Sequence, residues 1–414
     1  MKKLDYRELT PMTTGWLTAV GALLAVIAVA MGAVYYMEHN GHWVTGMTNQ
    51  VVWGMPHVFA IFLIVAASGA LNIASIGSVF GREPYQPLGR LSGVMAISLL
   101  AGGLAVLVLD LGRPDRLIVA MTHYNFKSIF AWNVILYNGF FAIVGVYLWT
   151  MMDWKMKRFY KPAAIFAFLW RLILTTGTGS IFGFLLAREG YGSAVMAPLF
   201  IAMSFAFGLA VFLLVLMGLY GASGRPLSNE LVRMKGRLLG VFIAANLYFV
   251  AVQHVTNLYW ADKHGVEAFI LAGGNLYTFL FWGVQVVLGG LVPLALVFQK
   301  GATRCMVRAA SVLVVIGGLA QVYVIVIGGQ AFPLTLFPGM EVGSSFMDGS
   351  VAAYAPTLPE VLLGLGGFAI AVLLTVVVST YLRVLPSSLG HGDEAEAEVL
   401  HADPAIEAEV APAE

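Results

Sequence analysis

The segment LAVLVLDLGRPDR, residues 104–116, sets a run of aliphatic side chains directly before a cluster of charges. Its apolar part belongs to a longer stretch, residues 91–111, which can cross a bilayer as one helix because a span needs about 20 mostly apolar residues. Asp110 then lies at the membrane edge, and three further charged residues follow it in the next loop. The segment therefore predicts a membrane helix that ends in an ionisable cluster.

The whole chain has the composition of a membrane protein. Of its 414 residues, 59% are hydrophobic and 11% are charged, and the mean hydropathy is +0.85. A water-soluble chain of this size needs more surface charge. We predict an all-α integral membrane protein with about ten transmembrane helices in one membrane domain, residues 15–385. The expected spans are 15–37, 53–80, 91–111, 128–150, 163–187, 195–220, 238–261, 275–298, 308–330 and 359–383.

Two features could change this count: a kink in the long second stretch, or a re-entrant part of 331–358. Positive charge predicts the orientation, because Lys and Arg concentrate in cytoplasmic loops. With a cytoplasmic N-terminus, 17 of the 23 Lys and Arg residues fall in inner segments. We therefore expect both termini in the cytoplasm. Residues 1–14 form a short cytoplasmic segment, and residues 386–414, acidic and rich in Ala and Pro, form a disordered cytoplasmic tail.

Several classes of protein are excluded. The single cysteine, Cys305, rules out a disulfide framework, a thiolate zinc site and an iron–sulfur cluster bound by this chain. There is no nucleotide-binding glycine motif, and a net charge of +1 gives no indication of nucleic-acid binding.

Polar residues gather on the outer side of the expected topology. Six of the eight histidines fall in the outer half, and the other two lie in the acidic tail. His57, Asp110 and His254 each lie near the outer end of a span. Ionisable groups in a bilayer are costly and usually mark pathways for protons or substrates. A quinol would suit this face, because its ring needs an apolar slot and its two oxygens need a donor or a base.

Each of these residues also has a purely structural explanation. Asp110 could simply pair with Arg113 or Arg116, and His57 could hydrogen-bond a neighbouring helix. Arg171 is harder to explain, because it lies about nine residues, or ~13 Å, inside its span. Thr and Ser residues follow it along the same helix, which predicts either a polar route through the membrane or a close helix contact.

Four tracts resemble a known family. LDLGRPDR (109–116), WGMPHVFAIFLIVAASGALNIAS (53–75), RLILTTGTGSIFGFLLARE (171–189) and NLYFVAVQHVTNLYWADKHGVEAFILAGGNLY (246–277) are similar to NrfD/polysulfide-reductase-type membrane subunits. The similarity covers nearly all of 10–385. Within the family, the chain most resembles the ten-span branch that includes the hydrogenase-2 and Hme subunits, and above all the DsrP type of the DsrMKJOP complex of dissimilatory sulfur metabolism.

The resemblance implies a subunit without its own metal or haem, built around two four-helix bundles in a prokaryotic inner membrane. It implies a menaquinone or ubiquinone site near the outer face. It also implies an extracytoplasmic ferredoxin-like iron–sulfur partner of the DsrO type. A multihaem cytochrome c of the DsrJ type and further subunits of the DsrM and DsrK types would belong to the same complex.

The resemblance places the quinone pocket near His57, with a second wall at Trp132 and Asn133. Our hypothesis adds that Asp110, positioned by Arg113, accepts or relays a proton. The expected quinone-binding residues are thus His57, Asp110, Arg113, Trp132 and Asn133. The expected proton-transfer residues are Asp110, Arg171, Glu189 and His254.

Three other functions remain open from the residues alone. A secondary transporter would explain Arg171, although transporter sites usually lie at the midplane rather than at one face. A b-type cytochrome would need facing histidine ligands, and only His57 and His254 lie within spans. A passive anchor would hold outer partners without binding a quinone.

Overall fold

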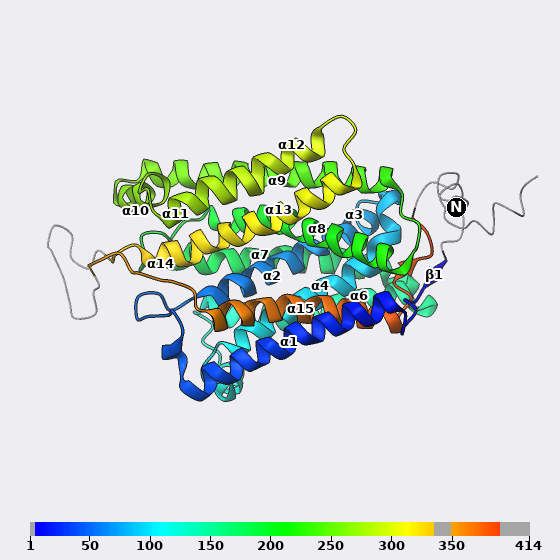
Figure 1. Ribbon diagram of the computed structural model, residues 1–414, viewed down its shortest axis with the longest axis horizontal. Coiled ribbons are helices and arrows are strands. Elements are labelled where there is room, and N and C mark those ends of the chain that lie inside the picture. The colour runs from blue at the N-terminus through cyan, green and yellow to red at the C-terminus, as the bar shows by residue number, and fades with distance from the viewer. Residues whose placement is uncertain (1–4, 335–348, 390–414) are drawn as a thin grey trace, which may run out of the picture.

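The computed structural model describes residues 5–334 and 349–389. It confirms an all-α chain with ten helical spans of membrane length (Figure 1). The spans are α1 (Thr14–Asn40), α2 (Met55–Ala70) with α3 (Asn72–Ser78), α4 (Gly89–Leu109), α6 (Ile129–Met152), α7 (Tyr160–Phe184), α8 (Met196–Ser223), α9 (Asn229–Tyr259), α11 (Leu276–Phe279) with η6 (Leu280–Leu291) and α12 (Val292–Phe298), α13 (Arg304–Tyr323) with η7 (Val324–Gly328) and α14 (Gly329–Ala331), and α15 (Leu358–Tyr381).

Short elements connect the spans. They are the helices α5 (Leu117–Thr122) and α10 (His264–Leu271), the 3₁₀ turns η1 (His42–Val44), η2 (Glu83–Leu88), η3 (Pro114–Arg116), η4 (Trp154–Phe159) and η5 (Ala261–Lys263), and the strands β1 (Tyr6–Arg7) and β2 (Leu385–Pro386). The second span is interrupted at Leu71, between α2 and α3, without a change in the number of spans. Half of the 331–358 loop, residues 335–348, lies outside the described residues.

The spans form two four-helix bundles. The first contains α2–α3, α4, α6 and α7, and the second contains α8, α9, α11–α12 and α13–α14. The two bundles meet where α2 packs along α8, while α1 and α15 pair with each other and flank α4 (Figure 1). In α2, 14 of 16 residues are buried, as expected for a helix that is apolar on all sides.

Glycines allow the bundles to approach closely. A Cβ atom on Gly208 of α8 would lie 2.2 Å from the carbonyl carbon of Gly69 of α2, and one on Gly69 would lie 1.6 Å from the carbonyl oxygen of Ser204. Small residues at such crossings let membrane helices pack through their backbones. The junction between the bundles therefore depends on these two glycines.

Replacing Gly208 with Ala is expected to destabilise the protein by roughly 3 kcal/mol, the upper end of the cost of overpacking a core, because the new methyl group meets backbone atoms. Thermal unfolding of the purified chain in detergent measures the change. Gly218→Ala in the same helix is the matched control, since nothing lies within 4 Å of its Cβ position. Equal melting temperatures for the two variants would contradict this packing.

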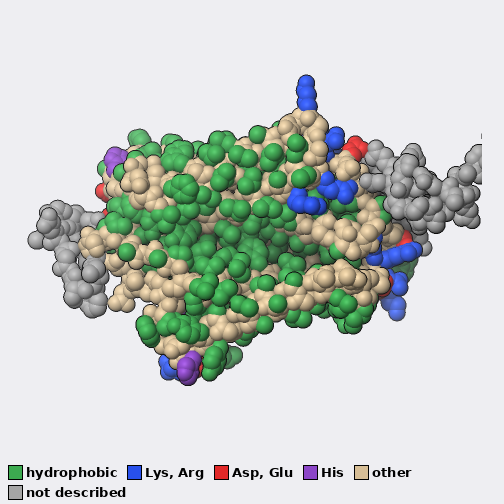
Figure 2. Space-filling view, viewed as in Figure 1, with side chains coloured by type: hydrophobic (Ala, Val, Ile, Leu, Met, Phe, Trp, Pro, Cys, Tyr) green, Lys and Arg blue, Asp and Glu red, His purple; other side chains and the backbone are tan. Residues whose placement is uncertain are grey.

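The two ends of the molecule differ in charge. Lys and Arg gather at the end that carries β1, and the flank between the ends is hydrophobic (Figure 2). We call this the Lys/Arg end; its residues include Arg90, Arg225, Arg304 and Arg383. The opposite end carries His57, His254 and Glu267, and we call it the histidine end. α2 and α8 run from the histidine end to the Lys/Arg end, whereas α4 and α9 run in the reverse direction.

The first and last described segments of the chain, beginning at Asp5 and ending at Leu389, lie together at the Lys/Arg end. β1 pairs antiparallel with β2, and the Arg225 guanidinium donates to the carbonyl oxygen of Glu8. Residues 386–389, expected as the start of a disordered tail, are ordered instead: Pro386 belongs to β2, and Ser228 N–H donates to the carbonyl of the buried Leu389. The membrane domain therefore extends past the expected boundary at 385, and residues 390–414 lie outside the described part of the chain.

Candidate functional site: a pocket in the first bundle

A pocket opens between α2, α4, α6 and α7 near the histidine end. Its volume is about 470 Å³, within the range of small-molecule sites. Apolar side chains form most of its wall, and a few polar groups converge at one side, the pattern expected of a site for a largely apolar ligand. The lining residues are Trp53, His57, Ile61, Ile64, Leu104, Leu107, Val108, Leu111, Leu117, Met121, Phe130, Asn133, Val134, Tyr137, Asn138, Thr178, Ile181 and Phe182.

His57 and Asp110 meet at this pocket. His57 lies in the first turn of α2, after Pro56, and Asp110 ends the antiparallel helix α4, so helix packing brings them to the same level. His57 Nδ1 lies 3.0 Å from Asp110 Oδ2; the Asp110 side chain is fully buried, whereas that of His57 is 22% exposed. The contact lies outside hydrogen-bond geometry, and such contacts often tighten when a substrate binds.

Arg113 does not position Asp110. Its guanidinium instead forms two hydrogen bonds of 3.1 Å with the carboxylate of Asp115, and both side chains are exposed. The Arg113 guanidinium lowers the pKa of the Asp115 carboxyl. The expected Asp110–Arg113 pair is therefore wrong: Gly112, at φ 64°, and Pro114 turn the chain after α4 and direct Arg113 toward solvent.

At the quinone site that the sequence predicts, Arg113→Ala is accordingly expected to change ligand affinity by less than about twofold, because an exposed ion pair contributes little. Titration of the purified protein with a quinone provides the measurement. A loss comparable to that of a pocket residue would show that Arg113 acts on the site after all.

The second wall contains Asn133 but not Trp132. Asn133 Nδ2 donates to the carbonyls of Ile129 and Gly177, and its Oδ1 accepts a long hydrogen bond, 3.5 Å, from Thr178. Trp132 is 46% exposed, does not line the pocket, and donates its indole N–H to the carbonyl of Phe126. Consecutive helical residues point about 100° apart, and the rotation of α6 turns Asn133 and Val134 toward the pocket and Trp132 away from it.

Trp53 also lines the pocket, although it was not among the expected site residues. Its ring lies nearly parallel to the imidazole of His57, with centroids 6.2 Å apart, and contacts the rings of Phe130 and Phe182. Gln330 of α14 fixes the Trp53 backbone by accepting from its N–H and donating to its carbonyl, both at 3.0 Å. The second bundle thus positions one wall of the pocket in the first.

Arg171 is buried in the middle of α7, about two turns from the pocket-lining Thr178. Its guanidinium lies over the rings of Phe168 and Phe205, and its Nε and Nη1 atoms have no hydrogen-bond partner among the described residues. The Thr175 hydroxyl lies 2.5 Å from Ser68 Oγ and 2.9 Å from the carbonyl oxygen of Arg171. A polar seam therefore runs along α7 toward the pocket.

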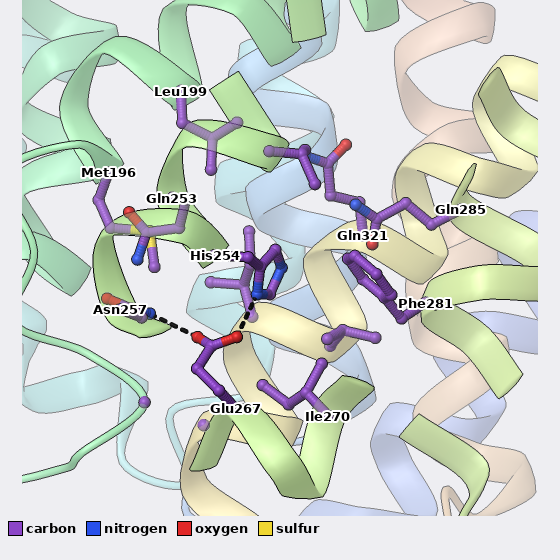
Figure 3. Close-up of a pocket in the computed structure, with 15 residues that line it drawn as sticks. Met196, Leu199, Gln253, His254, Asn257, Glu267, Ile270, Phe281, Gln285 and Gln321 are labelled. Atoms are coloured by element: carbon purple, nitrogen blue, oxygen red, sulfur yellow. Dashed lines mark hydrogen bonds and ion pairs between the residues drawn. The ribbon is translucent and has the colours of Figure 1, made fainter. Parts of the chain in front are cut away.

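Glu189 and His254 belong to a different part of the molecule. His254 of α9 contacts Glu267 of α10, with Nδ1 2.6 Å from Oε2, inside the second bundle (Figure 3). Glu189, in the loop after α7, interacts electrostatically with Lys263. The expected site residues are thus divided between two bundles rather than joined in one site.

A family model described as polysulphide reductase, NrfD, matches residues 43–334, which include both bundles and all residues that line the pocket. The chain belongs to the NrfD family. No group of three or more His, Cys, Asp or Glu that could hold a metal ion occurs among residues 5–334 and 349–389. In this NrfD-family protein, the pocket beside His57 is the first candidate for a functional site.

Relatives in several organisms share most of the chain. It is 26% identical to an Hdr-like menaquinol oxidoreductase integral membrane subunit of Archaeoglobus fulgidus, over 88% of this chain and 93% of the relative. It is also 26% identical to a putative dimethyl sulfoxide reductase membrane subunit of Halobacterium salinarum, over 92% of this chain and 93% of the relative. A polysulfide reductase chain of Wolinella succinogenes is 25% identical, over 69% of this protein and 96% of its own length.

Proposed function

We propose that this chain is the quinol-interacting membrane subunit of an oxidoreductase complex, and that the pocket of the first bundle is its quinol site. One observation carries the proposal: an apolar pocket of about 470 Å³ holds a histidine that is backed by a fully buried carboxylate. Membership in the NrfD family and the similarity to a menaquinol oxidoreductase subunit support it.

The residues of the pocket suit the two requirements of quinol oxidation. The apolar wall and Trp53 would hold the ring and its tail, and the His57 ring would take a proton from one quinol hydroxyl. Asp110 would orient the imidazole through Nδ1 and leave Nε2 as the accepting atom. Loss of the second hydroxyl proton to water at the pocket, and of both electrons to a partner subunit, completes the conversion of quinol to quinone. The same residues serve the reverse reaction.

We further propose an orientation in the membrane, a class of quinone and a set of partner subunits. The Lys/Arg end, with residues 1–14 and the acidic tail, would face the cytoplasm of a prokaryotic cell, and the histidine end would face an extracytoplasmic iron–sulfur partner. The quinone would be menaquinone or ubiquinone, and the complex would be of the DsrMKJOP type, with this chain as its DsrP-like subunit. DsrO-, DsrJ-, DsrM- and DsrK-like chains would be its partners.

We also propose that the seam on α7 conducts protons, away from the pocket during quinol oxidation and toward it during the reverse reaction. Arg171, Thr175 and Thr178 follow one another at intervals of three to four residues on one face of the helix, and Thr178 lines the pocket. Buried donors such as the Arg171 guanidinium are normally satisfied by ordered water, which would link these groups.

Filling the pocket tests the assignment. Val108→Trp places an indole inside it and is expected to lower both co-purified quinone and quinol oxidation at least about tenfold, because the ring would occupy the volume of the ligand. Val119→Trp is the matched control, since Val119 lies on nearby α5 and is 54% exposed. Lipid extraction of the purified complex with quantification of quinone provides the measurement; unchanged quinone content in Val108→Trp would overturn the proposal.

A further inference from the structure

The second bundle contains a polar cavity of its own, close to the histidine end. Its volume is about 40 Å³, enough for one or a few water molecules but too small for a quinone. Residues of α9, α10, η6 and α13 surround it, and none of them lines the pocket of the first bundle. The polar residues of its wall are Gln253, His254, Asn257, Glu267, Gln285 and Gln321 (Figure 3).

An acid–base pair lies at the mouth of this cavity. Glu267, 1% exposed, accepts from Asn257 Nδ2 at 2.7 Å through one oxygen and contacts His254 Nδ1 at 2.6 Å through the other. The His254 ring also contacts the edge of Phe281, with centroids 4.7 Å apart. A buried carboxylate at this distance from an imidazole can share or exchange one proton with it.

Lys263 lies beside this pair, and Glu189 interacts with Lys263 in turn. The Lys263 ammonium donates to the carbonyls of Tyr191 and Gly192, and it is coupled electrostatically to both Glu267 and Glu189. Burial lowers the pKa of the Lys263 ammonium, whereas the two carboxylates act to raise it. The pair thus lies within a small charged group at the histidine end.

A second observation indicates that the cavity holds water. Gln253 is 3% exposed; its Oε1 accepts from the Ser193 hydroxyl at 2.8 Å, but its Nε2 has no hydrogen-bond partner among the described residues. The side chain lines the cavity. Buried amide donors are almost always satisfied by protein or by ordered water, so a water molecule is the expected partner of Nε2.

The polar lining continues into the middle of the bundle. Gln285 and Gln321 also line a second cavity, of about 10 Å³, together with Asn246. Asn246 and Gln321 exchange two amide hydrogen bonds, of 2.8 and 3.2 Å. Gln285 belongs to η6, a π-helical segment, and such segments occur often at functional sites. From Asn257 to Asn246 the lining extends 11 residues along α9, or about 16 Å.

Toward the Lys/Arg end this polar lining stops. The next buried charged residue of α9 is Lys235, again about 16 Å away along the helix, and buried Leu239 and Ile243 lie between. The Lys235 ammonium lies over the ring of Tyr85 and donates to the carbonyl of Pro84. Among the described residues, the polar lining therefore leads from the histidine end only to the centre of the bundle.

We propose that the second bundle contains a proton-binding site, the His254–Glu267 pair, connected by water and amide groups to Asn246 and Gln321 at the bundle centre. The site takes up and releases one proton through the histidine end. It is separate from the quinol pocket and gives the subunit a second place where protons are exchanged.

Infrared spectroscopy of the purified full-length chain tests this proposal without any quinone. The carbonyl stretch of a protonated carboxylic acid should appear as the pH is lowered, shift in heavy water, and disappear in Glu267→Gln. Glu360→Gln is the matched control: Glu360 is equally buried near the same end, but it is hydrogen-bonded to Tyr354, Thr357 and the Gly46 N–H outside the cavity. The Glu360→Gln variant should therefore retain the pH-dependent carbonyl band.

A second experiment replaces His254, the histidine of the pair. His254→Gln should change the pH at which the band appears, whereas His264→Gln, an exposed histidine bonded to the carbonyl of Leu258, should not. If Glu267→Gln does not fold, the comparison of His254→Gln with His264→Gln is sufficient to test the proposal. Identical spectra of wild type and both cavity variants would overturn the proposal, as would a band insensitive to heavy water or one that responds to sodium ions rather than to pH. Because no quinone is present, failure here is distinct from failure of the quinol site.

Discussion

Replacing His57 with Ala is expected to lower quinol oxidation by the complex about 100-fold or more, the range typical of a lost acid–base group. His57 is the imidazole of the pocket, and its ring is backed by Asp110 and flanked by Trp53. Alanine removes the atom proposed to take the quinol proton and also leaves the Asp110 carboxylate without the imidazole beside it. Turnover with a soluble quinol analogue and quinone content after lipid extraction are the two measurements.

His264→Ala is the control for this experiment. His264 lies at the same end of the molecule, but it is exposed and bonded only to the carbonyl of Leu258, so its loss should leave turnover within about twofold of wild type. Assembly of the complex should be the same for both variants. Unchanged turnover and quinone affinity in His57→Ala would remove the pocket from consideration as the quinol site.

Asp110→Asn is expected to slow quinol oxidation by about 100-fold while quinone binding is largely retained. The carboxylate behind an imidazole fixes its tautomer, and an amide of the same shape can present the wrong group to the ring. Asp110 is fully buried and only 3.0 Å from His57 Nδ1, so its replacement cannot be compensated by solvent. The expected pattern is a fall in kcat with little change in KM.

Asp115→Asn provides the matched comparison within the same LGRPDR segment. Asp115 is exposed and pairs with Arg113, so its variant should behave as wild type. Asp110→Glu, which keeps the charge, should recover part of the lost rate. If Asp110→Asn instead turned over normally at every pH, Asp110 would be a structural residue at the end of α4.

The amino-acid sequence was sufficient to predict the membrane class, the ten spans and the end of the molecule at which the polar residues gather. Bilayer thickness sets the length of an apolar run, and position within that run sets the depth of a side chain, so His57, Asp110 and His254 could be assigned to one end without a structure. The depth of a side chain in the membrane depends only on nearby residues of the same span, so it can be predicted from the sequence.

Which of these side chains meet is a matter of tertiary structure. Arg113 contacts Asp115 and not Asp110, Trp53 rather than Trp132 faces the pocket, and His254 pairs with Glu267 on another helix. Each outcome depends on the rotation of a helix about its axis, where one residue changes the direction of a side chain by about 100°, and on contacts with helices distant in sequence. That rotation is set by packing, such as the close approach of Gly69 and Gly208, which no single stretch of sequence contains.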